Sequence, residues 1–277
     1  MRIFPLRLAA CCAALTLASP GESQLPAPAP TYADLADLAL AAPVTAQVRL
    51  TRSIEIKGER AANVPQSLAR FYVEADIVSL IRSAEPLPTR VNYLLDVPRD
   101  ARGKAPKLRK GSEYILFAAP VRGRPDSLQL IARDAHLPLA PEPAAQVRAI
   151  LTEAYGADAP PRITGIGRAF HVPGSLPGEG ETQIFLQTED KRPVSLNVLR
   201  RPGEQPRWAV ALSEIVDEAA APPRPDSLLW YRLACSLPRG LPRQSLAESD
   251  AGNAALAARD YGFVLEQLGP CVKTRRE

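Results

Sequence analysis

Proline is the residue that most constrains how this chain can fold. The 277 residues include 29 prolines, which is about twice the ordinary share. Because proline has no backbone N–H and a fixed φ, it interrupts helices and the inner strands of sheets. The chain is therefore expected to consist of short elements joined by proline-rich loops. Apolar residues make up 46% of the sequence, enough to give those elements a real core.

The first 18 residues have the pattern of a secretory signal peptide. Arg2 and Arg7 supply the positive start, and an apolar run at 8–18 ends in residues suited to cleavage. This run is only about half the roughly 20 apolar residues that a membrane span needs. Cys11 also fits a lipoprotein cleavage pattern, although Arg7 leaves almost no apolar stretch before it. We expect a periplasmic or secreted protein with no transmembrane segment in the mature chain.

Loss of the signal peptide changes the balance of charge. Removing Arg2 and Arg7 from the 34 lysines and arginines leaves 32, against 30 acidic residues. The mature chain is then close to neutral, and it works outside the cytoplasm. Both features argue against nucleic acid as a partner. Residues 19–30, which include four prolines, are predicted to be an extended spacer.

Residues 31–139 are predicted to form an OB-like β-barrel domain that begins with a helix. Thr31 and Asp34 fit a capping box at the start of this helix, and Pro43 ends it. Five β-rich segments separated by turn residues then favour a small closed barrel. The predicted strands are 46–56, 69–81, 90–97, 113–118 and 128–132.

This barrel resembles the exported tissue-inhibitor/netrin module. The resemblance rests on Asp34–Leu35 in the helix, a strand leading into Lys57–Gly58, and the late sequence KGSEYILF at 110–117. It implies an OB-type fold and raises a protease-inhibitor-like module as one function to consider. The N-terminal cysteines that staple those inhibitors are absent here, so no inhibitory residue is carried over. The whole chain also resembles a family of exported bacterial proteins of unassigned function, which implies no particular chemistry.

Residues 140–277 are predicted to form an α+β domain with a helix on an antiparallel meander sheet. Apolar spacing over 147–154 predicts a helix that ends at Gly156. Two further helices, capped by Asp226 and Asp250, are expected to finish the chain. The predicted strands are 162–172, 182–188, 193–199 and 207–212. One sheet face is expected to carry Val194, Leu196, Val198, Trp208, Val210 and Leu212. The fold class predicted for the whole chain is α+β.

Two cysteines remain after export, Cys235 and Cys271, each at the end of a predicted helix. In an oxidising compartment such a pair predicts a disulfide. The alternative is a nucleophilic or redox thiol. The pair lacks a Cys-x-x-Cys spacing, and no histidine lies nearby in the sequence.

The loop at 99–111 is the most basic stretch of the chain, with Asp100 its one acidic residue. Such a loop could bind an anionic glycan, a lipid head group or an acidic envelope protein. It could equally be a solvated connection that keeps a sheet edge soluble. The candidate binding residues are Lys104, Lys107, Arg109 and Lys110. Aromatic residues that could stack on sugars or bases are Phe71, Tyr72, Tyr93 and Tyr114, of which Phe71 fits the core better.

No catalytic motif or metal-ligand spacing is recognisable, and no cofactor is expected. His171 and Ser175 lie in the glycine-rich stretch 165–182, which is predicted to be a long flexible connection. With Asp190 or Asp217 they could assemble a hydrolase-like set in space, although nothing in the spacing requires it. The alternative is a strand end and a hairpin loop, with His171 in a structural role. A pocket holding His171 beside a carboxylate and a hydroxyl would favour an enzyme.

The leading hypothesis is a non-catalytic exported protein that binds an envelope partner or ligand. The first alternative is an envelope hydrolase centred on His171 and residues 165–182. The second alternative is a protease-inhibitor-like module, which rests on the barrel resemblance alone.

Overall fold

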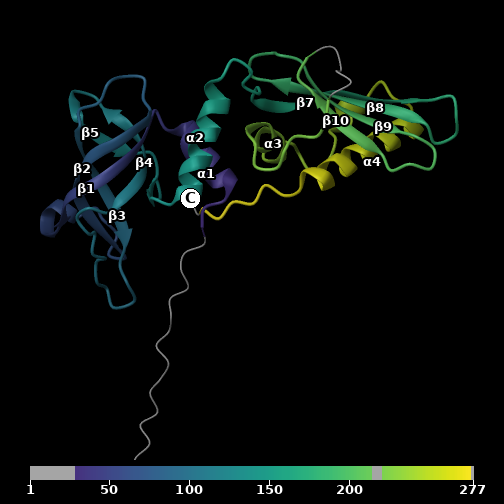
Figure 1. Ribbon diagram of the computed structural model, residues 1–277. Coiled ribbons are helices and arrows are strands. Elements are labelled where there is room, and N and C mark those ends of the chain that lie inside the picture. Colours follow the sequence, from purple (N-terminus) through teal and green to yellow (C-terminus); the bar gives the residue numbers. More distant parts are fainter. Residues whose placement is uncertain (1–28, 214–219, 276–277) are drawn as a thin grey trace, which may run out of the picture.

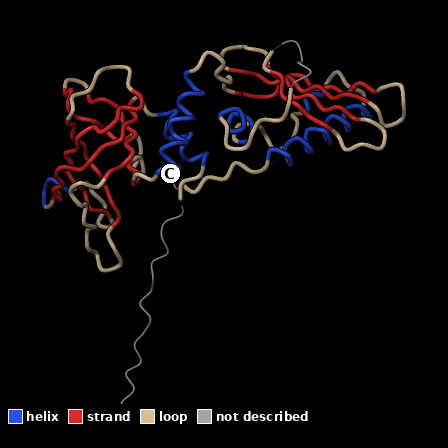
Figure 2. Tube along the Cα trace, in the orientation of Figure 1, coloured by secondary structure: helices blue, strands red, loops and turns tan. Residues whose placement is uncertain are grey.

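The computed structural model describes residues 29–213 and 220–275 (Figure 1). The predicted signal peptide at 1–18 and the spacer as far as residue 28 lie outside the described residues. A barrel and a four-stranded sheet lie at opposite ends of an elongated molecule. Helices α1 (Tyr32–Ala41) and α2 (Pro141–Tyr155) lie between them (Figures 1 and 2). The α+β fold class predicted from the sequence is confirmed. Within the described residues, no helix is both long and apolar enough to cross a membrane.

The barrel is closed, and its strand order is the one expected of an OB-like barrel. The order is β1-β2-β3-β5-β4, and β4 pairs back onto β1. The short strand β6 (His136–Pro138) pairs with β4, and a 3₁₀ turn, η1 (Gly58–Ala61), follows β1. The five barrel strands are β1 (Val44–Ile56), β2 (Leu68–Arg82), β3 (Arg90–Pro98), β4 (Glu113–Val121) and β5 (Arg124–Leu130).

One barrel strand begins earlier than predicted. Strand β5 starts at Arg124, whereas the sequence pattern indicated 128–132. The start of this strand is hard to recognise in the sequence, because its first three residues are charged or proline and are exposed: Arg124, Pro125 and Asp126. A strand that pairs weakly with its neighbour tolerates such residues, as edge strands do. Phe71 is buried in the barrel core, as its alternation with polar neighbours predicted.

The second sheet is the predicted antiparallel meander. Its strands are β7 (Ile163–Pro173), β8 (Gly180–Thr188), β9 (Val194–Arg200) and β10 (Arg207–Ala211), each paired with the next. Val194, Leu196 and Val198 pack beside Trp208 and Val210 as predicted. The prediction for Leu212 is wrong, because Leu212 follows the end of β10 and is 43% exposed.

Helix α4 (Ala251–Leu268) is the helix that lies along this sheet, and α3 (Leu228–Ala234) and η2 (Arg243–Leu246) pack beside it (Figure 1). Asp250 caps α4, since its Oδ1 accepts from the N–H groups of Gly252 and Asn253. The predicted cap of α3 is wrong by one residue. Ser227 is the cap, because Asp226 has a φ of 53° and lies in the turn before it.

Of the two interpretations of the glycine-rich stretch 165–182, the strand end followed by a hairpin loop is confirmed, and the long flexible connection is wrong. Strand β7 continues to Pro173 and β8 begins at Gly180, so only 174–179 form the hairpin loop. Of the glycines that suggested a loop, Gly165 and Gly167 lie instead where the β7–β8 register shifts. A Cβ on Gly167 would lie 3.3 Å from the Phe185 carbonyl oxygen, so glycine there permits a close approach of two strands.

A third core joins the two β-structures. Leu35 and Leu38 of α1 pack with Ile150 of α2 and with Ile115 and Phe117 of the barrel. The rings of Tyr32 and Trp230 meet edge to face, with centroids 6.1 Å apart, so α3 also reaches this core. This core takes residues from both sides of the predicted boundary at 139/140, and the division into two domains there stays a prediction.

Candidate functional site

The barrel carries a pocket of about 540 Å³ at the join between β3 and β5, which we call the seam pocket. These strands are parallel and pair only at Asn92–Ser127 and Tyr93–Leu128. Because the pairing is so short, buried side chains of the barrel interior line the pocket. Its buried lining residues are Tyr93 and Leu128, and outward-facing residues of β2 and β3 form one side. The full lining is Arg70, Tyr72, Asn92, Tyr93, Leu94, Asp96, Val121, Arg124, Ser127, Leu128, Gln129, Leu130, Ala132 and Arg133.

The polar groups of the seam pocket divide into paired and unpaired ones. Arg70 donates two hydrogen bonds to Asp96, of 2.7 and 2.6 Å, and this bond raises the pKa of the guanidinium. Asn92 accepts a hydrogen bond from Ser127 Oγ at 3.0 Å. Arg124 and Arg133 are exposed, and neither forms an ion pair with any described residue. Two guanidinium groups at the pocket are therefore free to meet an anion.

A buried histidine lies behind the pocket. His136 Nε2 is 2.9 Å from the Tyr93 hydroxyl, and the Tyr114 ring stacks on the imidazole with centroids 4.0 Å apart. Burial lowers the pKa of His136 to about 4 and raises the pKa of Tyr93. The imidazole is therefore neutral at pH 7, and one hydrogen bond joins its Nε2 to the Tyr93 hydroxyl. Of the aromatic residues named as stacking candidates, Tyr93 and Tyr114 are engaged with His136, and Tyr72 is left on the outer face.

The basic loop, residues 99–111, is held in place by two of its own charged residues. Arg99 donates to Glu55 at 2.8 Å and to the Leu68 carbonyl at 3.1 Å. Asp100 accepts from the backbone N–H groups of Arg102 and Lys104. The remaining cations are exposed and form no ion pair with any residue that the structure describes: Arg102, Lys104, Lys107, Arg109 and Lys110.

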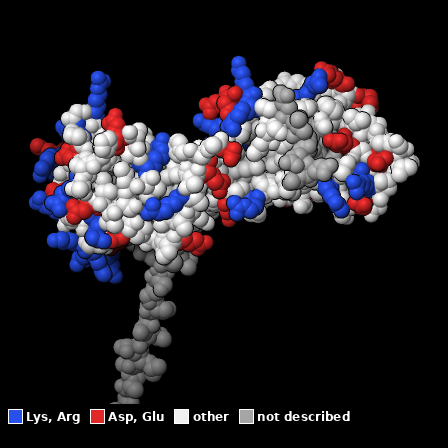
Figure 3. All heavy atoms as spheres, turned by 45° about the horizontal axis from the view of Figure 1, so that its top comes forward, with Lys and Arg blue, Asp and Glu red and all other residues white. Residues whose placement is uncertain are grey.

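The basic loop and the seam pocket are connected through one residue that lines the hollows beside both. A second hollow, of about 730 Å³, is lined by Arg99, Lys104 and Lys107. Arg70 lines both this hollow and the seam pocket, so the two share a wall. Lys and Arg side chains gather on the outer end of the barrel in Figure 3. Two of the residues predicted to bind a ligand, Lys104 and Lys107, thus line a hollow that the sequence did not reveal, while Arg109 and Lys110 line neither this hollow nor the seam pocket.

His171 lies elsewhere, in a buried polar cluster between the second sheet and α4. The residue is 6% exposed, and its Nδ1 is 2.8 Å from the Thr182 hydroxyl. Thr182 donates to Asp260 Oδ2, while Arg200 Nε donates to Asp260 Oδ1 at 2.7 Å. Since the one hydroxyl proton of Thr182 goes to Asp260, the Nδ1–H of His171 must donate to Thr182. The expected hydroxyl and carboxylate neighbours of His171 are present.

The other members of the hydrolase-like set are not assembled among the described residues. Ser175 lies in the exposed loop, where its backbone N–H donates to Glu179 Oε2 at 3.0 Å. Asp190 is paired with Arg192 in the β8–β9 turn, and Asp217 lies outside the described residues. His171 and Ser175 both line a pocket of about 460 Å³, together with Arg200 and Arg259 among others.

Cys235 and Cys271 form the predicted disulfide, with Cα atoms 5.1 Å apart. Within the described residues, no three His, Cys, Asp or Glu side chains come together as a metal site. The sequence matches no protein-family model and no curated protein. Interpretation of the site therefore depends on the geometry above.

Proposed function

We propose that the protein is a non-catalytic binding protein of the cell envelope, and that its barrel binds an anionic glycan. The observation that carries this proposal is Arg70, which lines both the seam pocket and the hollow beside Lys104 and Lys107. A ligand in the pocket meets apolar and aromatic surface from Tyr72, Leu94 and Leu128. The same ligand can extend past Arg70 towards Lys104 and Lys107.

The chemistry of the lining suits a charged sugar. Sugar rings pack their C–H faces on aromatic and aliphatic side chains, while an amide such as that of Gln129 bonds to hydroxyls. The free guanidiniums of Arg124 and Arg133 suit carboxylate or sulfate groups, which they bind through paired N–H donors. The exposed cations of the basic loop add a positive electrostatic potential, which attracts an anionic ligand over a longer distance at low salt.

Calorimetric titration with size-matched oligosaccharides tests the proposal. One arm uses oligogalacturonides, which are carboxylated, a second uses sulfated oligosaccharides, and a third uses neutral malto-oligosaccharides. We expect the anionic ligands to bind in a salt-dependent manner and the neutral ones not to bind. The variant R124Q/R133Q should weaken binding by at least about tenfold, since each charged hydrogen bond contributes about 1.5–3 kcal/mol.

The matched control is R201Q/R207Q, which removes the same charge from exposed positions near the ends of β9 and β10. This control should bind like the wild type. Equal weakening in both double variants would mean that net charge alone attracts the ligand. Absence of binding to any anionic glycan would contradict the proposed function.

A hydrolase is the second candidate, and the His171–Thr182–Asp260 cluster is the observation that favours it. A carboxylate that orients a histidine through a hydroxyl could support general-base chemistry at Nε2. The test is hydrolysis of a panel of nitrophenyl esters and glycosides by the wild type and H171N. Activity lost in H171N with an unchanged melting temperature would support this candidate. Absence of turnover by the wild type would remove it.

A further inference from the structure

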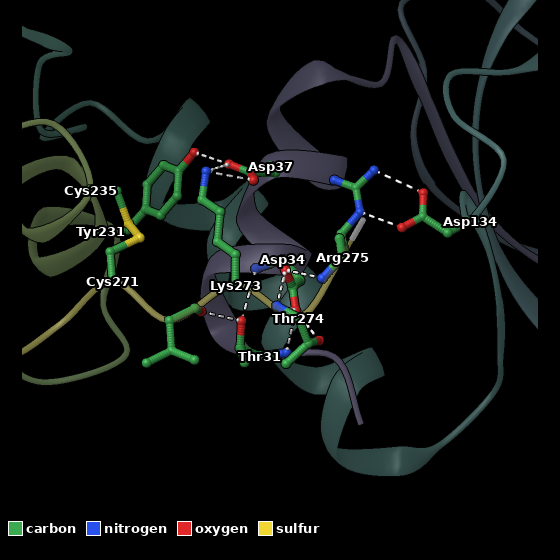
Figure 4. A network of polar contacts seen from close by, with 11 residues as sticks. Thr31, Asp34, Asp37, Asp134, Tyr231, Cys235, Cys271, Lys273, Thr274 and Arg275 are labelled. Atoms are coloured by element: carbon green, nitrogen blue, oxygen red, sulfur yellow. Dashed lines mark hydrogen bonds and ion pairs between the residues drawn. A yellow bond between two sulfur atoms is a disulfide. The ribbon is translucent and has the colours of Figure 1, made fainter. Parts of the chain in front are cut away.

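The segment 271–275 follows the end of α4 and runs to α1 and to the turn that precedes β6 (Figures 1 and 4). Its first residue, Cys271, is bonded to Cys235 at the end of α3. The next four residues contact α1 and the turn at 132–135, which precedes β6. We call residues 271–275 the clasp, because they contact both β-containing halves of the molecule.

Asp34 of α1 is the centre of the clasp (Figure 4). Its carboxylate accepts from the backbone N–H of Thr274 at 3.0 Å, from the Thr274 hydroxyl at 2.6 Å and from the backbone N–H of Arg275 at 3.2 Å. The same carboxylate accepts from the Thr31 N–H, so it caps α1 and holds the clasp at once. Asp34 is fully buried, which makes these hydrogen bonds strong and their loss unfavourable.

A second contact joins the clasp to α1 and α3 together. Lys273 Nζ lies 2.8 Å from Asp37, and the Tyr231 hydroxyl of α3 donates to the same carboxylate at 2.6 Å. The Thr31 hydroxyl donates to the Val272 carbonyl at 2.7 Å. The disulfide keeps the clasp close to these partners, and so raises its effective concentration at α1.

The last contact of the clasp reaches the seam pocket. Arg275 donates two hydrogen bonds to Asp134, of 2.6 and 2.9 Å. Asp134 follows Ala132 and Arg133, both of which line the seam pocket. The turn that holds these residues is closed by a bond from the Ala135 N–H to the Ala132 carbonyl, of 3.2 Å. Arg275 is therefore the link from the second sheet to one wall of the pocket.

We propose that the clasp regulates ligand binding by holding the 132–134 wall of the seam pocket in place. This inference rests on the proposed function for its ligand, and on the contacts above for its mechanism. When Arg275 and Asp134 are paired, Arg133 is presented to the pocket by a fixed turn. When the clasp is released, that turn keeps the Ala135–Ala132 bond and the flanking backbone bonds of Phe117 to Ile131 and Ala135, but Asp134 loses its side-chain partner and the turn samples more conformations. The pocket then binds its ligand less tightly, because the wall must be ordered on binding.

Hydrogen–deuterium exchange read by mass spectrometry tests the clasp without a ligand. Three variants are compared with the oxidised wild type: R275Q, D134N and C235A/C271A. The control is R192Q, which removes an Arg–Asp pair from the β8–β9 turn. In R275Q and D134N, exchange of the amides at 131–136 should rise by at least about fivefold. In C235A/C271A, α1 should also exchange faster, since Asp34 loses an anchored partner. The control should match the wild type.

The affinity for oligogalacturonide is then measured in the same four variants. We expect R275Q and D134N to bind roughly three- to tenfold more weakly, through faster dissociation. Unchanged exchange at 131–136 in both variants would overturn the clasp. Raised exchange with unchanged affinity would show that the clasp holds the turn without regulating the pocket, which would overturn the proposal. If the wild type binds no anionic glycan, the proposed function fails, and the exchange result still decides whether the clasp holds the turn.

Discussion

His136 shows how one buried side chain ties stability to pH. Its pKa is lowered by burial from 6.5 to about 4, so the unfolded state takes up a proton more readily than the folded state. The stability that neutral His136 contributes is therefore fully present above pH 6.5, and the free energy of unfolding falls as the pH drops towards 4. We predict a loss of up to about 3 kcal/mol in the free energy of unfolding across this range. In H136Q, urea titrations should show most of that slope removed. An unchanged slope would show that His136 is not the group responsible.

Asp34 also loses its contribution to stability in acid, but in a lower pH range than His136. Burial acts to raise the pKa of this carboxyl, but the Thr274 side chain and the backbone N–H groups of Thr31, Thr274 and Arg275 outweigh it and lower the pKa to about 2. The stability that it contributes is present above its ordinary pKa of 3.8 and is lost as the pH falls towards 2. D34N should destabilise by about 1–3 kcal/mol at pH 7. The difference between D34N and the wild type should shrink below pH 4. A constant difference down to pH 2 would contradict this account.

Sequence reasoning found one of these two residues. Thr31 and Asp34 have capping-box spacing, which is a local pattern that can be read from neighbouring residues. No local pattern gives His136 a role, because Tyr93, its hydrogen-bond partner, is 43 residues away in the chain. The same limit applies to Asp260, which meets Thr182 across 78 residues.

At the level of elements, the β7–β8 hairpin depends on Gly180. A Cβ at this position would lie 2.5 Å from His171 Nε2 and 2.8 Å from the Val172 carbonyl oxygen. Because one of these atoms is backbone, the strand itself must shift. We predict that G180A lowers the free energy of unfolding by about 1–3 kcal/mol. Thermal unfolding measures the change.

Gly262 is the matched opposite case. It lies inside α4, and a Cβ there meets no atom within 4 Å. G262A should raise the free energy of unfolding by up to about 1 kcal/mol, because alanine favours the helix and has less freedom when unfolded. If both alanine variants change stability in the same direction, the contact at Gly180 is not the cause.

Helices and strands with a regular alternation of apolar and polar residues were predictable from the sequence, and elements that interrupt this alternation were not. The strands of the meander alternate apolar and polar residues, and their bounds agree with the structure to within about two residues, the usual uncertainty of such bounds. Strand β5 was predicted late because its first three residues carry charge or are proline. The hairpin at 174–179 was predicted too long because glycines at β7 bulges look like loop residues.

At the scale of the whole molecule, the sequence indicated the barrel, the sheet and the disulfide, but not the way they join. The disulfide was predicted from the two cysteines that lie outside the predicted signal peptide, and the structure confirms it. The clasp could not be predicted, because Thr274 and Asp34 are 240 residues apart and carry no recognisable motif. The seam pocket was equally hidden, since it arises where β3 and β5 pair through only two residues each.

The seam pocket of the barrel is proposed to bind an anionic glycan. The most direct test is an NMR titration of the isotopically labelled protein with an oligogalacturonide, followed by backbone chemical shifts. We expect chemical-shift changes concentrated at Tyr72, Asn92 and Gln129. Further changes should follow the basic loop, and none should appear on β9 and β10. Shifts confined to the second sheet, or no shifts at millimolar ligand, would contradict it.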